Sequence, residues 1–142
     1  MRHIMVATDG SSGADRAVDV AAELVKAVGG NLSILTVGGN LSGEDMRQLA
    51  HAEGNIGDAL ESLSTQILWE AKERARRLGV SAIHVQTAWG DAAEAIIEAA
   101  RREHSDAIVV GRRGRGRLAG LLLGSVSQKI VSLAPCIVIV VP

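Results

Sequence analysis

A stretch rich in glycine and arginine, residues 111–125, carries the residue types best suited to binding an anion. It follows a short aliphatic run at 106–110 and leads into a helical pattern that begins at Gly124 and Ser125. Glycines let backbone amides approach an anion closely, because they carry no Cβ. The N–H groups and the positive dipole end at a helix start favour an anion as well. The stretch therefore predicts a polyphosphate site, to which the Ser125 hydroxyl adds one donor.

Two common nucleotide-binding motifs do not occur in this stretch. The sequence has no G-x-x-x-x-G-K-[ST], and Gly114-x-Gly116 is followed by Gly120, one position too late for the dinucleotide fingerprint. P-loop and dinucleotide sites are therefore disfavoured.

The arginines of the stretch leave three interpretations open: a solvated basic face, a phosphate clamp, or an RGR-type contact to nucleic acid. They are Arg112, Arg113, Arg115 and Arg117. A guanidinium group suits phosphate, so Arg112 and Arg113 are candidate ligands. Nucleic acid is not expected as the main ligand, because single-strand binders use aromatic stacking platforms and the chain has neither Phe nor Tyr. The net charge of −1 also gives no overall attraction to nucleic acid or to an anionic membrane.

The elements that must position this stretch alternate between aliphatic strands and amphipathic helices. Four aliphatic runs are typical of buried strands: 3–8, 32–37, 106–110 and 136–141. A fifth run, at 80–88, alternates in polarity like a partly exposed edge strand. Helical spacing of apolar residues predicts helices over 14–28, 57–78, 91–103 and 124–133. This alternation predicts a parallel α/β sheet with helices on both faces. Residues 38–56 have weak periodicity and are expected to form a long excursion.

Length and composition bound the class of protein. A chain of 142 residues fits one α/β domain spanning 1–142, with an aliphatic core because 47% of residues are hydrophobic and aromatic residues are few. The sequence lacks a signal-peptide pattern and a transmembrane-length apolar run, so a cytoplasmic protein without membrane insertion is expected.

The four histidines of the sequence show no metal-ligand spacing, so no protein metal site is expected. Trp69 is expected to pack, and Trp89 either packs or lines a crevice.

Polar residues directly after the strands are the next candidates, because ligands of open α/β sheets bind at the carboxyl ends of the strands. Thr8-Asp9-Gly10 follows the first strand. Asp9 can stiffen the local turn as an Asx turn or contact a ligand, and the second interpretation depends mainly on the family resemblance that follows.

Residues 111–125 match the signature G-x2-G-x9-G-[ST] of the universal stress proteins, and the chain resembles that family along its whole length. Ile4–Ser11 resembles the family's opening strand and turn, and Gly90-Asp91 resembles the start of its third helix. Ala134-Pro135-Cys136 resembles the segment that leads into its last strand. One departure is Ile137, where the family often has proline. The resemblance implies a Rossmann-like, adenine nucleotide alpha hydrolase-like fold: a single-domain, open five-stranded parallel sheet with strand order 3-2-1-4-5.

The resemblance also implies the residues of a nucleotide site. Asp9 would face the ribose or adenine, Val37 would offer backbone groups to the adenine, and the signature glycines with Ser125 would hold the ribose and phosphates. The full set of predicted nucleotide-binding residues is Ala7, Thr8, Asp9, Val37, Gly111, Arg112, Arg113, Gly114, Gly116, Gly124, Ser125, Val126 and Ser127.

The function implied is an ATP-binding module, with Mg²⁺ on the phosphates, whose occupancy regulates a stress response. The output would pass through a homodimer formed along the last strand, Cys136 to Val141, or through a protein partner. An exposed apolar edge strand invites such pairing. Two alternatives stay open: a slow ATPase or autokinase with Ser125 or Ser127 as phosphoacceptor, and a dimeric scaffold that binds no nucleotide. No catalytic residue is predicted, since nothing positions an attacking water.

Overall fold

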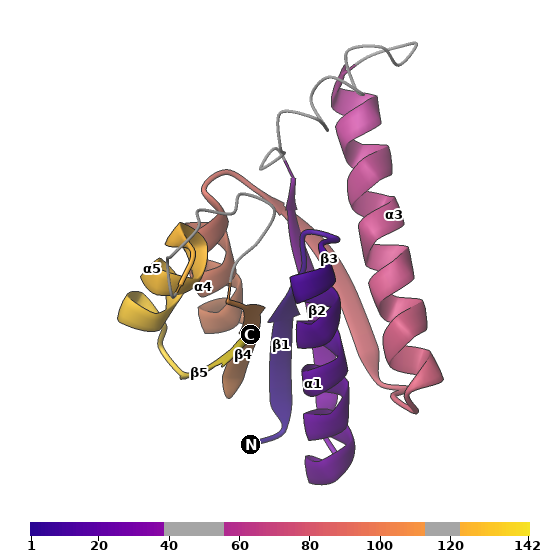
Figure 1. The fold of residues 1–142 in the computed structure, drawn as a ribbon, viewed down its shortest axis with the longest axis vertical. Coiled ribbons are helices and arrows are strands. Elements are labelled where there is room, and N and C mark those ends of the chain that lie inside the picture. The colour runs from indigo at the N-terminus through magenta and orange to yellow at the C-terminus, as the bar shows by residue number, and fades with distance from the viewer. Residues whose placement is uncertain (39–55, 113–122) are drawn as a thin grey trace.

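Strands and helices alternate along the chain, as the sequence predicts (Figure 1). The structure is a computed structural model that describes residues 1–38, 56–112 and 123–142. Within them the order is β1 (His3–Ala7), α1 (Ser12–Val28), β2 (Asn31–Gly38), α3 (Ile56–Arg77), β3 (Ile83–Trp89), α4 (Ala92–Arg102), β4 (Ala107–Gly111), α5 (Ser125–Leu133) and β5 (Ile137–Val141). All the strands pair in parallel in the order β3-β2-β1-β4-β5, which confirms the predicted fold class and strand order. The excursion expected between β2 and α3 lies outside the described residues, apart from its two ends.

Local capping explains where α1 begins and ends and where α4 begins. The Ser11 hydroxyl accepts a hydrogen bond from the backbone N–H of Ala14 at 3.2 Å, which starts α1. Gly29 ends the same helix in the left-handed conformation, with φ of 71°. Asp91 caps α4 through the backbone N–H of Glu94 at 3.0 Å. These caps place the helix starts at the carboxyl edge of the sheet, directly after β1 and close after β3.

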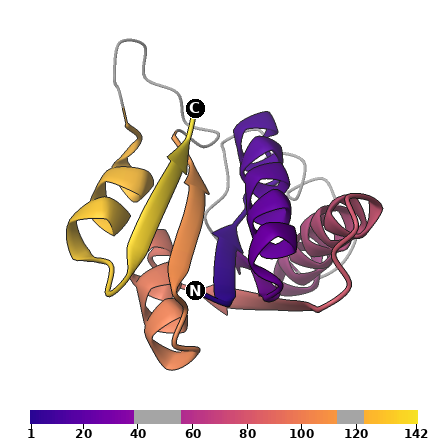
Figure 2. The same ribbon diagram turned by 90° about the horizontal axis from the view of Figure 1, so that it is seen from below.

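The sheet is the middle of three layers (Figure 2). Helices α1 and α3 pack on one face, where Ile4 and Val6 of β1 point, and α4 and α5 pack on the other, where Met5 points. Burial of both faces explains why the central strands are continuously aliphatic. The prediction for Trp69 is wrong: this side chain lies on α3 but is 60% exposed. No helix in the described part of the chain is both long and apolar enough to cross a membrane.

An ion pair joins α1 to α3 on the outside of the first layer. The Arg74 guanidinium donates two hydrogen bonds to the Asp19 carboxylate, at 2.6 and 2.8 Å, and lies 3.8 Å from Asp15. The hydrogen bond from Arg74 lowers the pKa of Asp19. Burial raises the pKa of Asp15, against the attraction of Arg74 and with further repulsion from Asp19, Glu70 and Asp9. Arg74 therefore stabilises the charged form of Asp19 far more than the charged form of Asp15.

This asymmetry predicts opposite effects for two matched substitutions. A lowered pKa means that Asp19 stabilises the fold above its unfolded pKa, near 3.8, and loses that contribution as the pH falls further. A raised pKa means that charged Asp15 costs stability once the pH rises above that range. Because both carboxylates are partly exposed, we expect Asp19→Asn to lower the melting temperature at pH 7 by only about 1–4 °C. We expect Asp15→Asn to leave it unchanged or slightly higher.

Circular-dichroism melts at pH 7 and at pH 3 check both expectations. The Asp19→Asn difference should shrink at pH 3, because this pH lies below the unfolded pKa near 3.8 and part of the stabilisation by the charged carboxylate is lost there. A loss of stability that is equally large at both pH values would contradict the ion-pair explanation.

Close backbone packing holds the amino end of β1. The Asp106 carboxylate accepts hydrogen bonds from the backbone N–H groups of Arg2 and His3, at 2.8 and 2.9 Å, and these two bonds lower its pKa. The Arg2 carbonyl accepts from Asn31 N–H at 2.8 Å. Next to it, a Cβ on Gly30 would lie only 2.0 Å from the Arg2 carbonyl oxygen. Gly30 is therefore required by the close approach of a neighbouring backbone.

Candidate functional site

The direction of the connections reverses between β1 and β4, and open α/β sheets bind ligands in a crevice at the carboxyl ends of such strands. The chain leaves β1 into α1 on one face of the sheet and leaves β4 toward α5 on the other, so the two connections diverge there. Most of the predicted site residues that the structure describes lie in these two connections or at the ends of the elements that they join. Ala7 and Gly111 are the last residues of β1 and β4, Ser125, Val126 and Ser127 form the first turn of α5, and Val37 lies half-buried on β2.

The turn after β1 is built by its own polar side chains. Thr8 is buried, and its hydroxyl accepts from the Gly10 N–H at 3.1 Å. One Asp9 carboxylate oxygen accepts from the Ser11 N–H at 2.9 Å. The Asx turn considered from the sequence is therefore present, and it fixes the Asp9 carboxylate at the entrance to α1.

Gly111 ends β4 directly against the first turn of α1. A Cβ at this position would lie 3.1 Å from both the carbonyl carbon and the carbonyl oxygen of Gly13, closer than side chains normally approach. The end of β4 and the first turn of α1 thus meet at two glycines. The sequence signal for Gly111 was a phosphate-binding pattern, and this packing requirement was not visible in it.

The start of α5 differs from the starts of α1 and α4. Gly124 is its N-cap and supplies no side-chain hydrogen bond, and the first turn carries no acidic residue. By contrast, α1 and α4 each have a side-chain cap and an acid in the first turn. The positive end of α5 is thus not offset by its own first-turn side chains, and Ser125 is exposed there while Val126 is half-buried. This arrangement suits an anion.

Ser127 and Arg112 connect α5 to the end of β4. The Ser127 hydroxyl is buried and donates to the Arg112 carbonyl at 2.7 Å, with the Gly124 carbonyl at 3.1 Å. The Arg112 N–H continues the β4–β5 pairing by donating to Val141 at 2.7 Å, and its carbonyl also accepts from Gly124 N–H at 2.8 Å. In this structure the Ser127 hydroxyl therefore holds the helix start in place. Three other predicted residues, Arg113, Gly114 and Gly116, lie outside the described residues.

Removal of the Ser127 hydroxyl should loosen the helix start without orphaning a buried group, because the Arg112 carbonyl keeps its bond from Gly124. We expect Ser127→Ala to lower the free energy of unfolding by about 0.5–1.5 kcal/mol. Urea unfolding measures this loss, and Ser132→Ala, which removes an exposed hydroxyl bonded to Gln128 within the same helix, is the matched control. Equal losses in the two variants would argue against a special role for the Ser127 bond.

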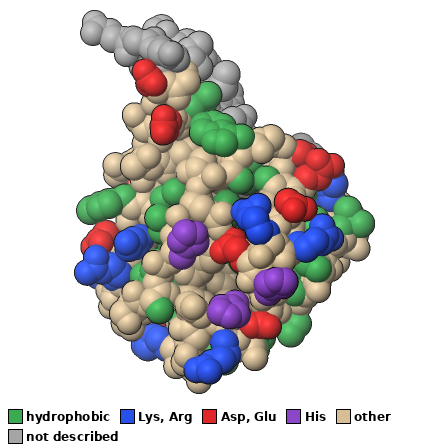
Figure 3. Space-filling view, turned by 180° about the vertical axis from the view of Figure 1, so that it is seen from behind, with side chains coloured by type: hydrophobic (Ala, Val, Ile, Leu, Met, Phe, Trp, Pro, Cys, Tyr) green, Lys and Arg blue, Asp and Glu red, His purple; other side chains and the backbone are tan. Residues whose placement is uncertain are grey.

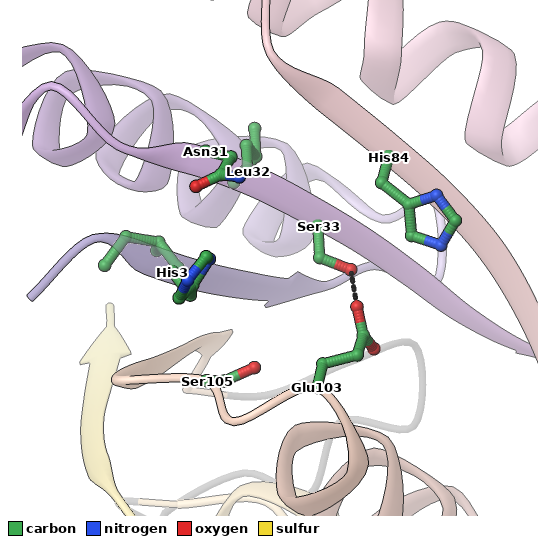
Figure 4. A pocket seen from close by; sticks show the side chains of 8 residues that line it. His3, Asn31, Leu32, Ser33, His84, Glu103 and Ser105 are labelled. Carbon is green, nitrogen blue, oxygen red and sulfur yellow. Dashed lines mark hydrogen bonds between the residues drawn. The ribbon is translucent and has the colours of Figure 1, made fainter.

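A hollow of about 140 Å³ lies at the opposite, amino-terminal edge of the sheet (Figure 4). None of the predicted site residues lines it; its lining is His3, Ile4, Asn31, Leu32, Ser33, His84, Glu103 and Ser105. Figure 3 shows histidine, acidic and basic side chains close together on one face of the molecule. The hollow is lined by the starts of strands, whereas ligands of open α/β sheets bind at their carboxyl ends. We therefore place the candidate site at the β1/β4 crevice.

The hollow does reveal a polar network that sequence reasoning missed. The Glu103 carboxylate accepts from the Ser33 hydroxyl at 2.9 Å and from the side-chain amide of Gln86. The Arg102 guanidinium donates to the Gln86 carbonyl oxygen at 3.3 Å. These bonds dock the end of α4 onto β2 and β3. The period-2 alternation of 80–88 showed which residues share a face, but it gave no sign that Glu103 meets them.

Comparison with known proteins places the chain in a family. A sequence model described as "Universal stress protein family" matches residues 1–142. The chain belongs to the universal stress protein family. Among curated members, it is 35% identical to a universal stress protein of Thermus aquaticus, covering 97% of this chain and 96% of that one. It is also 35% identical to the universal stress protein YxiE of Bacillus subtilis, covering 97% of each.

A solved structure of a universal stress protein in complex with cAMP has the same fold. It superposes with a TM-score of 0.76 and 31% sequence identity, covering 99% of this chain and 97% of that one. The family resemblance inferred from the glycine signature is thus confirmed for the full chain.

Proposed function

We propose that this universal stress protein binds ATP, with Mg²⁺, in the crevice between β1 and β4, and that occupancy regulates a cytoplasmic stress response. The observation that carries the proposal is the convergence of Asp9, Gly111 and the uncapped start of α5 at the edge where the strand order reverses. Residues 1–142 act as one domain in this proposal.

An adenine nucleotide is the ligand class that the site supports best. The solved universal stress protein at 31% identity holds cAMP, which has the adenine and ribose of ATP but a single phosphate. The glycine signature of residues 111–125 and the positive end of α5 favour a longer phosphate chain. Mg²⁺ is usually held by substrate phosphates with one or two carboxylates, and Asp9 lies at this edge to provide one.

Binding to the purified protein tests the proposal. Heat denaturation should release a co-purified adenine nucleotide, and ATP added at 100 times its dissociation constant should stabilise the fold by about 2.7 kcal/mol, an increase of about 8–11 °C in melting temperature. AMP, cAMP and GTP measured in parallel define the ligand. Tighter binding of cAMP than of ATP would replace the ATP assignment, and no shift with any adenine nucleotide would reject nucleotide binding altogether.

The main alternative is an enzyme that hydrolyses ATP slowly or phosphorylates itself. Ser125 is exposed at the start of α5 and is the candidate phosphoacceptor that a terminal phosphate reaches more easily, because Ser127 is buried. Incubation with γ-labelled ATP separates the two functions. Retention of intact ATP without phosphate release or protein labelling supports a binding module, and labelled protein supports the enzyme.

A homodimer along β5 would give nucleotide binding an output. β5 is an edge strand, and Ile137 at its start is 57% exposed, as is Leu133 at the end of α5. A bare apolar edge favours pairing with a second chain. Sedimentation of the protein with and without ATP tests the link. A single monomeric species under both conditions would refute the dimer, and a protein partner would then have to read the occupancy.

A further inference from the structure

Trp89 occupies an unusual place at the carboxyl edge of the sheet. It is the last residue of β3 and is 53% exposed, although it lies opposite Gly38 at the end of β2. A Cβ on Gly38 would lie 2.3–2.7 Å from three carbons of the indole ring. The ring therefore rests on the backbone of Gly38, in space that only glycine leaves open. One side of the indole is held in place while much of the ring faces solvent.

Simple packing accounts for only part of this arrangement. A tryptophan that served only to fill the interior would be mostly buried. The largest fully buried side chains of the described residues are instead aliphatic, apart from one methionine. Here the indole is fixed by close contact yet left open. A rigid, half-open aromatic face at a strand end is suited to stacking against a flat ligand.

The position of Trp89 relative to the crevice suggests which part of a ligand it meets. The strand ends run in the order β3, β2, β1, so the end of β2 lies between Trp89, which pairs with Gly38, and Asp9, which follows β1. Adjacent strands lie about 4.8 Å apart, so the backbones of β3 and β1 are separated by about 10 Å at this edge. A purine base lying across the end of β2 fits between them, with the phosphates directed toward β4 and α5.

We propose that the exposed face of Trp89 stacks on the base of the bound nucleotide and forms the outer wall of the base pocket. This inference rests on the proposed function and adds a base-recognition residue to it. Stacking accepts any base, because every base has a π-face. Trp89 therefore contributes affinity for any base, and selectivity for adenine comes from the hydrogen-bonding groups around Val37 and Asp9.

The two tryptophans of the chain make a direct test possible, because Trp69 lies on α3, outside the proposed base pocket. In Trp69→Phe, all tryptophan emission comes from Trp89, and ATP titration should quench it. In Trp89→Phe, the emission of Trp69 should stay constant while calorimetry still detects ATP. We expect Trp89→Ala to weaken ATP binding by about 5- to 150-fold, the loss that corresponds to one base–aromatic stack. Its affinity for inorganic tripolyphosphate, which has no base, should not change.

Each result decides for or against the stack. Quenching in Trp69→Phe, together with a loss in Trp89→Ala that is confined to ATP, supports it. Equal weakening of ATP and tripolyphosphate would show that Trp89 acts only through the fold, and an unchanged ATP affinity in Trp89→Ala would overturn the stack while leaving the proposed function intact. If the wild-type protein binds no adenine nucleotide, the proposed function fails, and the stack fails with it.

Discussion

Ser125→Asp should abolish most ATP binding while leaving the free protein as stable as before or slightly more stable. Ser125 is the first residue of α5, whose start has no side-chain cap and no first-turn acid. An aspartate there interacts favourably with the helix dipole, by about 0.3–1 kcal/mol. The same charge repels a phosphate bound at that helix start. At 4 Å and an effective dielectric constant of 20 the repulsion is about 4 kcal/mol, and screening by salt reduces it. We therefore expect ATP affinity to fall at least 30-fold.

Because Ser125→Asp should keep or raise the stability of the free protein but lower its ATP affinity, a loss of affinity cannot be attributed to misfolding. Calorimetry gives the affinity, and a thermal melt of the free protein gives the stability. Ser125→Asn is the matched control, because asparagine is close to aspartate in size, carries no charge and offers an amide donor in place of the Ser125 hydroxyl. The ATP affinity of this variant should stay within about threefold of wild type. Wild-type affinity in Ser125→Asp would show that the phosphates do not lie at the start of α5.

Gly30→Ala should be the most destabilising single methyl addition among the glycines discussed above. The added Cβ would lie 2.0 Å from the Arg2 carbonyl oxygen, and relief of that contact requires the Arg2 peptide to move. The move would break the hydrogen bonds that Arg2 makes with Asn31 and with the Asp106 carboxylate. Overpacking of this kind costs about 1–3 kcal/mol, and the loss of hydrogen bonds places this case at the upper end. We expect a fall of about 6–12 °C in melting temperature.

The neighbouring glycine provides the control for this prediction. Gly29 has φ of 71° and no atom within 4 Å of a built Cβ, so Gly29→Ala incurs only the cost of a left-handed alanine, about 1 kcal/mol. A smaller loss in Gly29→Ala than in Gly30→Ala is the expected order, and the reverse order would contradict the close approach of Arg2. Because both glycines lie at the amino edge, ATP should still stabilise both variants.

Much of the fold was predictable because its signals are local and repeated. Ser11, Gly29 and Asp91 are residue types typical of helix ends, and the continuous aliphatic runs predicted strands buried on both faces. Even the edge strand β3 was recognisable, since its alternating polar residues match its partial exposure. The strand order was a different matter. It came from the family resemblance, because alternating strands and helices are compatible with several parallel orders.

The candidate site was predictable in its glycines and less so in what surrounds them. The signature identified Gly111 and Gly124, and the Asx turn of Asp9 was one of the two interpretations open from the sequence. The contact of Trp89 with Gly38 and the burial of Ser127 were not, because both depend on pairs of elements that meet only in three dimensions. Trp69 was mispredicted because helical spacing does not by itself give the orientation of a helix face.

The position of β1 between β2 and β4 also affects how the chain folds during synthesis. Its partner on one side is complete at Gly38, but its partner on the other begins only at Ala107, about 70 residues later. At about 5–20 residues per second, a ribosome takes about 4–14 s to make that interval. During that time the edge of β1 that carries Ile4, Met5 and Val6 has no strand beside it. A nascent chain of this protein thus passes through a half-sheet with an open apolar edge, and an unpaired edge of this kind is prone to aggregation until β4 covers it.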